Sequence, residues 1–395
     1  MVVVIPASKK LAPPEGTRYV LPALEQQRQA LIDKLKQLYD TWGYQRIDMP
    51  VLEHYDPEHP AAEKSFKLSD RDSGVLALRA DFTPAVARLV QQRSDAPASD
   101  RPQRYQYCGK LWQAIDPDMA RTREYTQIGL ELIGVSNARA DAELIHLARE
   151  SVREVGLVPR VEVGNPGFVR SLFSLAELPL PLQASLAHAI DRKDSSAVHS
   201  LLSDLRLAPD MHRALVSVAD LYGHIEVIAE ARQLAPWPET CDELDRLEAI
   251  LAEFEDNSEL LLDLGMARRL SYYTGVTFRA YTFDFGQPLL GGGRYDGALL
   301  PYAAGFALGL ERIVSALPTW LKQPKALVLS LDDVGARRLR QQGHAVERAL
   351  SADVAVLRRY ALEQGIPFLL SKAGLEALVP NHPLQALLEQ QLAAA

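Results

Sequence analysis

Three side chains in the first third of the chain could accept hydrogen bonds from an ammonium group. They are Asp81, Gln127 and Glu131. The segment Tyr125–Ile133 alternates polar or small residues with aliphatic ones, and this alternation puts Gln127 and Glu131 on one face of a predicted strand. A polar face opposite an apolar one suits a binding cleft, although a solvated outer strand has the same pattern.

A second group of candidate residues, much later in the chain, combines a cation with aromatic rings. Arg268 could hold a carboxylate through paired hydrogen bonds. Tyr272 and Tyr273 are adjacent, so in a strand they point to opposite faces and one of them can line a pocket. Together with the acceptors for an amine, these residues predict a pocket for an amino acid. The residue types do not select which amino acid.

Other kinds of chemistry have little support in the sequence. The nine histidines are scattered, and the two cysteines, Cys108 and Cys241, have no metal-ligand spacing, so we expect neither a metal site nor a cofactor. No Walker-type loop and no nucleophile-elbow motif occurs. Gly291–Gly293 could cradle a phosphate or allow a ligand to approach the backbone, but turns use glycine in the same way.

Composition excludes further classes of protein. A chain of 395 residues with 47% hydrophobic and 24% charged residues is typical of a globular protein with more than one domain. The formal net charge of −8 argues against broad binding to phosphate backbones. No apolar stretch is long enough to span a membrane, and the N-terminus lacks a signal-peptide pattern, so we expect a cytoplasmic protein.

Periodicity and turn residues predict the elements that position these side chains. We expect paired strands over Arg104–Trp112 and Tyr125–Ile133, joined by a charged loop. A polar loop over His54–Gly74 would suit a cover for the site, and helical patterns dominate Pro166–Asp263. In the tail, a helix is predicted over Val334–Leu350.

Several segments, in the same order along the chain, resemble motifs of histidyl-tRNA synthetases, a family with the class II synthetase fold. The resemblance spans roughly residues 10–316 and implies an α+β fold, in which helices flank an antiparallel sheet. The matching segments are Gly43–Glu53, Leu78–Thr83, Tyr125–Glu131, Arg268–Gly275, Gly291–Gly297 and Gly305–Arg312. The resemblance also implies a histidine pocket formed by Asp81, Thr83, Gln127, Glu131, Arg268, Tyr272 and Tyr273.

The chain departs from the synthetases where ATP would be activated. Their second motif, Phe-Arg-x-Glu, carries an arginine that grips the α-phosphate, whereas this chain has Trp112-Gln-Ala-Ile115. A neutral Gln113 cannot stabilise developing phosphate charge. By analogy with oxyanion-hole deletions, the loss of the arginine costs roughly 2.7–4 kcal/mol of transition-state stabilisation. Phe82 also replaces a glycine, and Arg269 and Ser271 replace a glycine and an aspartate of the histidine motif.

A synthetase-like chain that keeps its amino-acid pocket but lacks the ATP clamp is similar to the regulatory subunits of ATP phosphoribosyltransferase. That resemblance implies that this chain is a non-catalytic partner of a short catalytic subunit and binds histidine as feedback inhibitor. It also implies that the chain forms a homodimer within a hetero-oligomer. The tail shows no basic or aromatic surface for reading an anticodon, so tRNA binding is not expected. Association with a membrane is not expected either. An active synthetase with a divergent second motif and a free-standing amino-acid sensor stay open as alternatives.

The resemblance and the linker signals divide the chain into five parts. Residues 1–165 and 264–316 are expected to form the two parts of the synthetase-like domain, and 166–263 a mainly helical insertion. Residues 317–324 are expected to form a linker, and 325–395 a small C-terminal α/β module.

Overall fold

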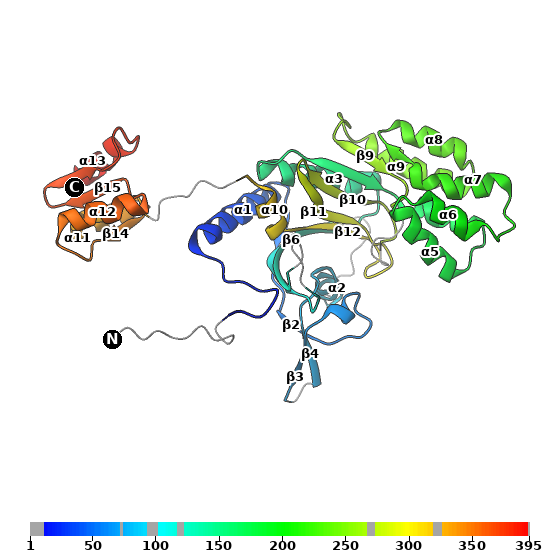
Figure 1. Ribbon diagram of the computed structural model, residues 1–395, viewed down its shortest axis with the longest axis horizontal. Coiled ribbons are helices and arrows are strands. Elements are labelled where there is room, and N and C mark those ends of the chain that lie inside the picture. Colours follow the sequence, from blue (N-terminus) through cyan, green and yellow to red (C-terminus); the bar gives the residue numbers. More distant parts are fainter. Residues whose placement is uncertain are drawn as a thin grey trace. The chain divides into compact units, whose positions relative to one another are not determined.

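The computed structural model describes residues 12–71, 74–92, 102–116, 122–266, 273–318 and 326–393. The chain divides into two compact units, Met1–Pro318 and Thr319–Ala395 (Figure 1), which are described separately here. None of the described helices is both long enough and apolar enough to cross a membrane.

A nine-stranded sheet forms the centre of the first unit. Neighbouring strands pair antiparallel except in two places, where β1 runs parallel to β5 and β7 runs parallel to β9, so the sheet is mixed. In spatial order the strands are β1 (Gln45–Arg46), β5 (Gln103–Trp112), β6 (Glu124–Ile133), β12 (Ala303–Gly309), β11 (Phe285–Arg294), β10 (Thr277–Thr282), β7 (Arg160–Gly164), β9 (Leu260–Asp263) and β8 (Tyr222–Gly223).

The alternation in β6 determines which side of the sheet is core and which side carries polar groups. Ile128, Leu130 and Leu132 are fully buried, and belong to the core that includes residues of α1 (Pro22–Thr41), α3 (Ala138–Glu154) and α10 (Leu310–Ala316). Each such side chain contributes about 1.5–3 kcal/mol by leaving water. Figure 1 shows these three helices on one face of the sheet and α2 (Thr83–Gln92) on the other.

The prediction of paired strands on either side of a charged loop is confirmed. Strands β5 and β6 pair antiparallel along their whole length, from Gln103 opposite Ile133 to Trp112 opposite Glu124. This register places Tyr107 directly across from Gly129, on the face that also carries Glu131. The α2 side of these strands has a core of its own, which includes Phe82, Tyr107 and Ile133.

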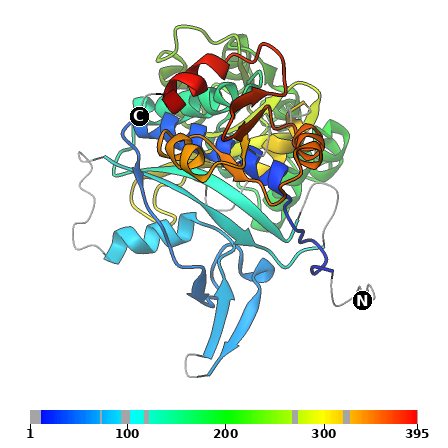
Figure 2. The same cartoon turned by 90° about the vertical axis from the view of Figure 1, so that its left-hand side faces the viewer.

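A small three-stranded sheet takes one of its strands, β3, from the segment that was expected to be a polar loop. Its order is β2 (Leu52–His54), β4 (Gly74–Leu78) and β3 (Lys67–Asp70), and the β3–β4 hairpin projects away from the main sheet (Figure 2). The loop prediction for His54–Gly74 is therefore wrong for Lys67–Asp70, which pairs with β4, and for a short 3-10 helix over Ala62–Lys64. The charged residues of β3 favoured a loop in the sequence, and the strand that pairs with β3 lies outside its local pattern.

The stretch from Pro166 to Asp263 is mainly helical, as predicted, but it also supplies β8 and β9 to the edge of the main sheet. Prolines begin several of its helices, and Asn165 accepts a hydrogen bond from Gly167 N at the first of them. We call the helices of this stretch the helical block. They are α4 (Pro166–Leu175), α5 (Leu180–Asp191), α6 (Ser195–Leu202), α7 (Pro209–Ser217), α8 (Glu226–Leu234) and α9 (Pro238–Leu251).

The second unit is a four-stranded sheet, in the order β14 (Val346–Arg348), β13 (Val328–Ser330), β15 (Phe368–Ser371) and β16 (Gly374–Ala377), with three helices. The helix predicted over Val334–Leu350 is wrong beyond Gln341. Gly343 has a positive φ of 86° and His344 N bonds back to Leu339 O, which ends the helix and lets β14 begin. The helices are α11 (Asp333–Gln341), α12 (Val354–Gln364) and α13 (Gln385–Ala393).

Candidate functional site

A pocket of about 220 Å³, which we call the amino-acid pocket, lies on the α2 side of the main sheet. Strand β6 contributes Gln127 and Glu131, the turn after β4 contributes Asp81, and the start of α2 contributes Thr83. Tyr273, just before β10, lines the same pocket. The structure thus brings these five predicted residues together. The other two predicted residues, Arg268 and Tyr272, lie outside the described residues.

Glu131 is the most enclosed acidic group of the pocket, with 1% of its surface exposed. Its Oε1 accepts hydrogen bonds from the Thr83 hydroxyl (2.9 Å) and the Tyr107 hydroxyl (3.3 Å). Its Oε2 accepts one from the Tyr295 hydroxyl (2.7 Å). The pKa of Glu131 is nevertheless raised to about 8, mainly by burial. The nearby charge of Asp81 also raises this pKa, whereas the three hydroxyl groups lower it.

Asp81 is the second acidic group of the pocket. Burial raises its pKa above the ordinary aspartate value, while a hydrogen bond from Thr83 N (3.2 Å) acts in the opposite direction. Two carboxyl groups with raised pKa values thus share one small cavity. Lys64 also lines this pocket, and a further cation bound near the two carboxyl groups would lower both pKa values.

An aromatic stack supports the hydroxyl of Tyr107. The Phe82 ring stacks on the Tyr107 ring, with centroids 4.4 Å apart, and the Arg79 guanidinium lies 4.0 Å from the Phe82 ring centroid. Arg79 is itself held by the carbonyl of Met49 (2.6 Å). Phe82, which departs from the glycine of the synthetases, therefore fills the space behind Tyr107.

Two tyrosines of the pocket, Tyr107 and Tyr295, were missed by the sequence reasoning. A signal for Tyr107 existed, because in an antiparallel pair the residue across from Gly129 shares its face with Glu131. Gly129 itself leaves the necessary room, since a Cβ there would lie 2.3 Å from the Tyr107 hydroxyl. Tyr295 lies within Gly291–Gly297, a segment that carries the resemblance but from which no pocket residue was expected.

A larger cavity of about 660 Å³ adjoins the amino-acid pocket and shares Gln113 and Gln127 with it. Gln113 donates from its side-chain amide to Ala80 O (3.2 Å), so the side chain at this position is directed to the backbone beside Asp81. Arg312 donates to Pro288 O (3.0 Å). The charged residues that line the larger cavity are Lys64, Asp191, Glu311 and Arg312.

The described residues contain no group of three or more histidine, cysteine, aspartate or glutamate side chains arranged to hold a metal ion. The acidic residues of the amino-acid pocket are instead bonded to hydroxyl groups and to backbone N–H groups. This arrangement suits a ligand with a positive charge and several hydrogen-bonding groups.

Comparison with known proteins shows the family to which this chain belongs. The sequence model of the histidyl-tRNA synthetase family matches residues 16–313. The ATP phosphoribosyltransferase regulatory subunit of Thermus thermophilus is 42% identical over 357 residues, which cover 90% of this chain and 96% of that protein. The chain belongs to this family of regulatory subunits. The regulatory subunit of Deinococcus radiodurans is also 42% identical, over 93% of this chain and 90% of its own.

Solved structures show that the family shares the fold of the synthetases. A Bacillus halodurans protein described as an ATP phosphoribosyltransferase regulatory subunit/histidyl-tRNA synthetase superposes with a TM-score of 0.77 at 27% identity, covering 88% of this chain and 96% of that one. The histidyl-tRNA synthetase of Nostoc sp. PCC 7120 superposes with a TM-score of 0.79 at 18% identity, covering 97% and 99%. The predicted class II synthetase-like fold is confirmed.

Proposed function

We propose that this chain is a non-catalytic regulatory subunit that a short ATP phosphoribosyltransferase catalytic subunit requires, and that it binds histidine as feedback inhibitor. One observation carries the proposal: Asp81, Thr83, Gln127, Glu131 and Tyr273 line one pocket, while Gln113 beside them is neutral and bonded to backbone. Membership of the regulatory-subunit family supports the assignment to this enzyme complex. A homodimer within the complex and a cytoplasmic location belong to the same proposal.

The pocket chemistry favours a free amino acid as ligand. An ammonium group offers three donors and a positive charge, which would stabilise the ionised forms of Asp81 and Glu131 against the burial that raises their pKa values. Gln127 and Tyr273 add an amide and an aromatic ring within the same cavity. A cavity of about 220 Å³ matches an amino acid better than a nucleotide, since drug-sized ligands occupy roughly 300–1,000 Å³.

The residues between the two cavities support the absence of synthetase catalysis in this proposal. Adenylation requires a cation at the transferring phosphate, and the side chain at position 113 is an uncharged amide that donates to Ala80 O. Arg312 and Lys64 line the larger cavity, and Lys64 lines the amino-acid pocket as well, but neither occupies sequence position 113. The pocket would therefore bind an amino acid without activating it.

Inhibition requires that histidine bind one state of the complex more tightly than the other. A ligand shifts an equilibrium only by its differential affinity for the two states, which in allosteric proteins is typically about 1–3 kcal/mol. The regulatory chain would thus support the active assembly when empty and the inhibited assembly when occupied.

Reconstitution tests the proposal. The purified chain should bind L-histidine by calorimetry, and adding it to a short catalytic subunit should produce phosphoribosyl transfer to ATP that histidine inhibits. Asp81→Asn should weaken the inhibition while still supporting activity, and Asp242→Asn, at an exposed position of α9, should behave like the unmodified chain.

Two outcomes would contradict the proposal. Appreciable histidine-dependent ATP–pyrophosphate exchange by the chain alone would identify an active synthetase with a divergent second motif. Histidine binding without complex formation or activation of the catalytic subunit would identify a free-standing amino-acid sensor.

A further inference from the structure

An arginine of the helical block holds one wall of the amino-acid pocket. Arg170, on α4, donates from Nη1 to Tyr273 O (3.2 Å) and from Nη2 to Thr274 O (2.7 Å). Tyr273 lines the amino-acid pocket. One planar guanidinium therefore binds two consecutive carbonyls of the segment that carries a pocket side chain, and such a fork fixes backbone position more strongly than a single bond.

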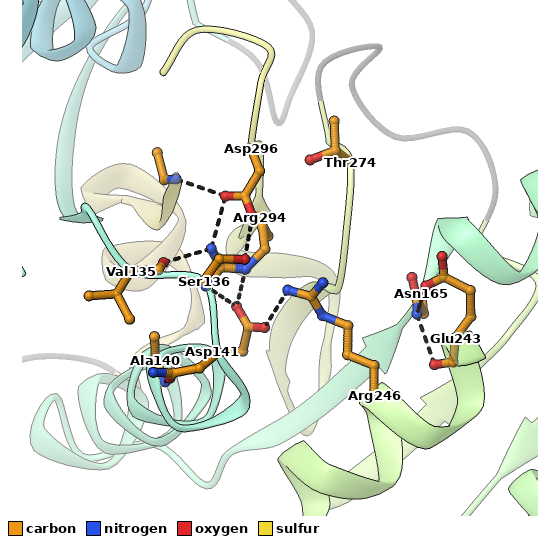
Figure 3. Close-up of polar contacts among 12 residues, drawn as sticks. Val135, Ser136, Ala140, Asp141, Asn165, Glu243, Arg246, Thr274, Arg294 and Asp296 are labelled. Carbon is orange, nitrogen blue, oxygen red and sulfur yellow. Dashed lines mark hydrogen bonds and ion pairs between the residues drawn. The ribbon is translucent and has the colours of Figure 1, made fainter. Parts of the chain in front are cut away.

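The helix that carries Arg170 is held in place by packing. Its neighbours on α4, Phe168, Val169 and Leu172, are fully buried in the main core. Asn165, at the start of α4, donates to the carboxylate of Glu243 on α9 (2.6 Å), a contact labelled in Figure 3. Packing of α4 thus fixes the backbone of Arg170, while its exposed side chain is held by the two bonds to Tyr273 O and Thr274 O.

The same pocket wall is also bonded to a buried arginine of the main sheet. Thr274 N donates to Arg294 O (2.8 Å), and the Arg294 side chain, 1% exposed, forms an ion pair with Asp141 (2.7 Å) and another with Asp296 (2.9 Å). Figure 3 shows this cluster, in which Arg294 also donates to Val135 O (2.9 Å). Charge pairing of this kind in a buried site resists displacement, because breaking it leaves unpaired charges.

A second arginine of the helical block reaches the same cluster. Arg246, on α9, donates to Asp141 Oδ2 (3.4 Å), the carboxylate that pairs with Arg294 (Figure 3). The residue after Arg294 is Tyr295, whose hydroxyl donates to Glu131. The helical block therefore contacts the pocket by two routes, one through Tyr273 and one through the Arg294 cluster.

We infer that Arg170 is a positioning residue through which the helical block sets the affinity of the amino-acid pocket. The inference rests on the proposed function, because it takes histidine as the ligand of that pocket. When Arg170 holds the Tyr273 backbone, the pocket wall is ordered before the ligand arrives, and binding loses less conformational entropy. Linkage then works in both directions: a bound amino acid also stabilises the contact of α4 with the wall.

Histidine affinity of matched variants tests the inference. Arg170→Ala should raise the dissociation constant roughly 3- to 30-fold, the range of couplings carried by residues that do not touch the ligand. Arg170→Lys, which keeps the charge but loses the two-pronged geometry, should fall between the two proteins. Arg232→Ala is the control, because Arg232 on α8 forms ion pairs only with Asp245 and Glu248 among the described residues.

Hydrogen exchange supplies a readout that a purely structural role would not move. Histidine should slow amide exchange in α4 and around Tyr273 of the unmodified chain, and Arg170→Ala should abolish the slowing in α4 while its melting temperature stays near that of Arg232→Ala. Unchanged affinity in a folded Arg170→Ala variant, or protection limited to the main sheet, would overturn the inference alone. Failure of the unmodified chain to bind histidine would overturn the proposed function as well.

Discussion

Glu131 and Gly305 lie directly opposite each other in the β6–β12 pair, and the carboxylate of Glu131 occupies the space that a side chain at position 305 would need. A Cβ at Gly305 would lie 2.0 Å from Glu131 Oε2 and 2.3 Å from Leu130 O. The buried carboxylate and the glycine-rich strand are therefore one structural feature. The absent side chain in β12 makes room for the acidic group in β6.

Gly305→Ala should displace Glu131 and weaken histidine binding. Part of the clash is with backbone, which cannot rotate away, so the added methyl should also lower the free energy of unfolding by about 1–3 kcal/mol, as overpacking does. Gly286→Ala in β11 is the matched control, because a Cβ there meets nothing within 4 Å. Calorimetric titration with histidine and urea unfolding measure both effects, and equal affinities for the two variants would refute the spatial argument.

Glu131→Gln should keep the shape of the pocket but remove the negative charge that Glu131 gains when a bound cation lowers its pKa. The amide can still bond to the hydroxyls of Thr83, Tyr107 and Tyr295, so the fold should survive. Histidine affinity should fall at least about 30-fold, since removing one partner of a buried charged pair costs roughly 2–5 kcal/mol. Gln127→Glu, on the same strand face, is the opposite change, and a similar loss from both variants would show that shape, and not charge, determines affinity.

The stability of the chain should decrease as pH rises from the acidic to the alkaline side of neutrality. Glu131 has a folded-state pKa of about 8 against a reference value of 4.5, so between these values the folded chain binds more protons than the unfolded chain. The free energy of unfolding then falls with rising pH by up to about 1.4 kcal/mol per pH unit and levels off above the folded pKa. Urea unfolding at a series of pH values measures the slope. Glu131→Gln should flatten it, and an equal slope in both proteins would assign the effect to other groups.

The polar face of β6 was predictable because it depends only on local alternation. Gln127 and Glu131 share a face whatever strand pairs with them, and the structure places both in the pocket. Their contact with histidine stays a prediction. Tyr107 and Tyr295 required more, namely the register of β5 with β6 and the position of β11 in the sheet. Register and strand order depend on contacts between distant segments, which no local pattern contains.

Local patterns also failed where short elements depend on distant partners. Lys67–Asp70 has two charged residues and a single apolar one, and it becomes a strand because Leu68 pairs with Leu76 in β4. In the second unit, the helical pattern after Val334 continues in the sequence, but the turn at Gly343 ends the helix. Glycine at this position was a signal for a helix end that the longer apolar periodicity outweighed.

Phe82 should link pocket affinity to the aromatic stack. The side chain is 1% exposed and lies between the Arg79 guanidinium and the Tyr107 ring. Phe82→Leu keeps apolar volume but removes the stacking and cation–π contacts, worth about 1–2 kcal/mol together. Without the stack, the Tyr107 hydroxyl should no longer be held toward Glu131, and histidine should bind more weakly. The same substitution at Phe368, a buried residue of the second unit, should lower stability without changing affinity.

A double-mutant cycle with Tyr107→Phe separates this route from general loosening of the core. If Phe82 acts by orienting the Tyr107 hydroxyl, then removing that hydroxyl should weaken histidine binding in the unmodified chain but change it much less in Phe82→Leu. The two substitutions should therefore couple by at least about 0.5 kcal/mol in binding free energy, as expected for residues in contact. Additive effects would mean that the two side chains act on the pocket independently, and that the hydrogen bond to Glu131 does not depend on the stack.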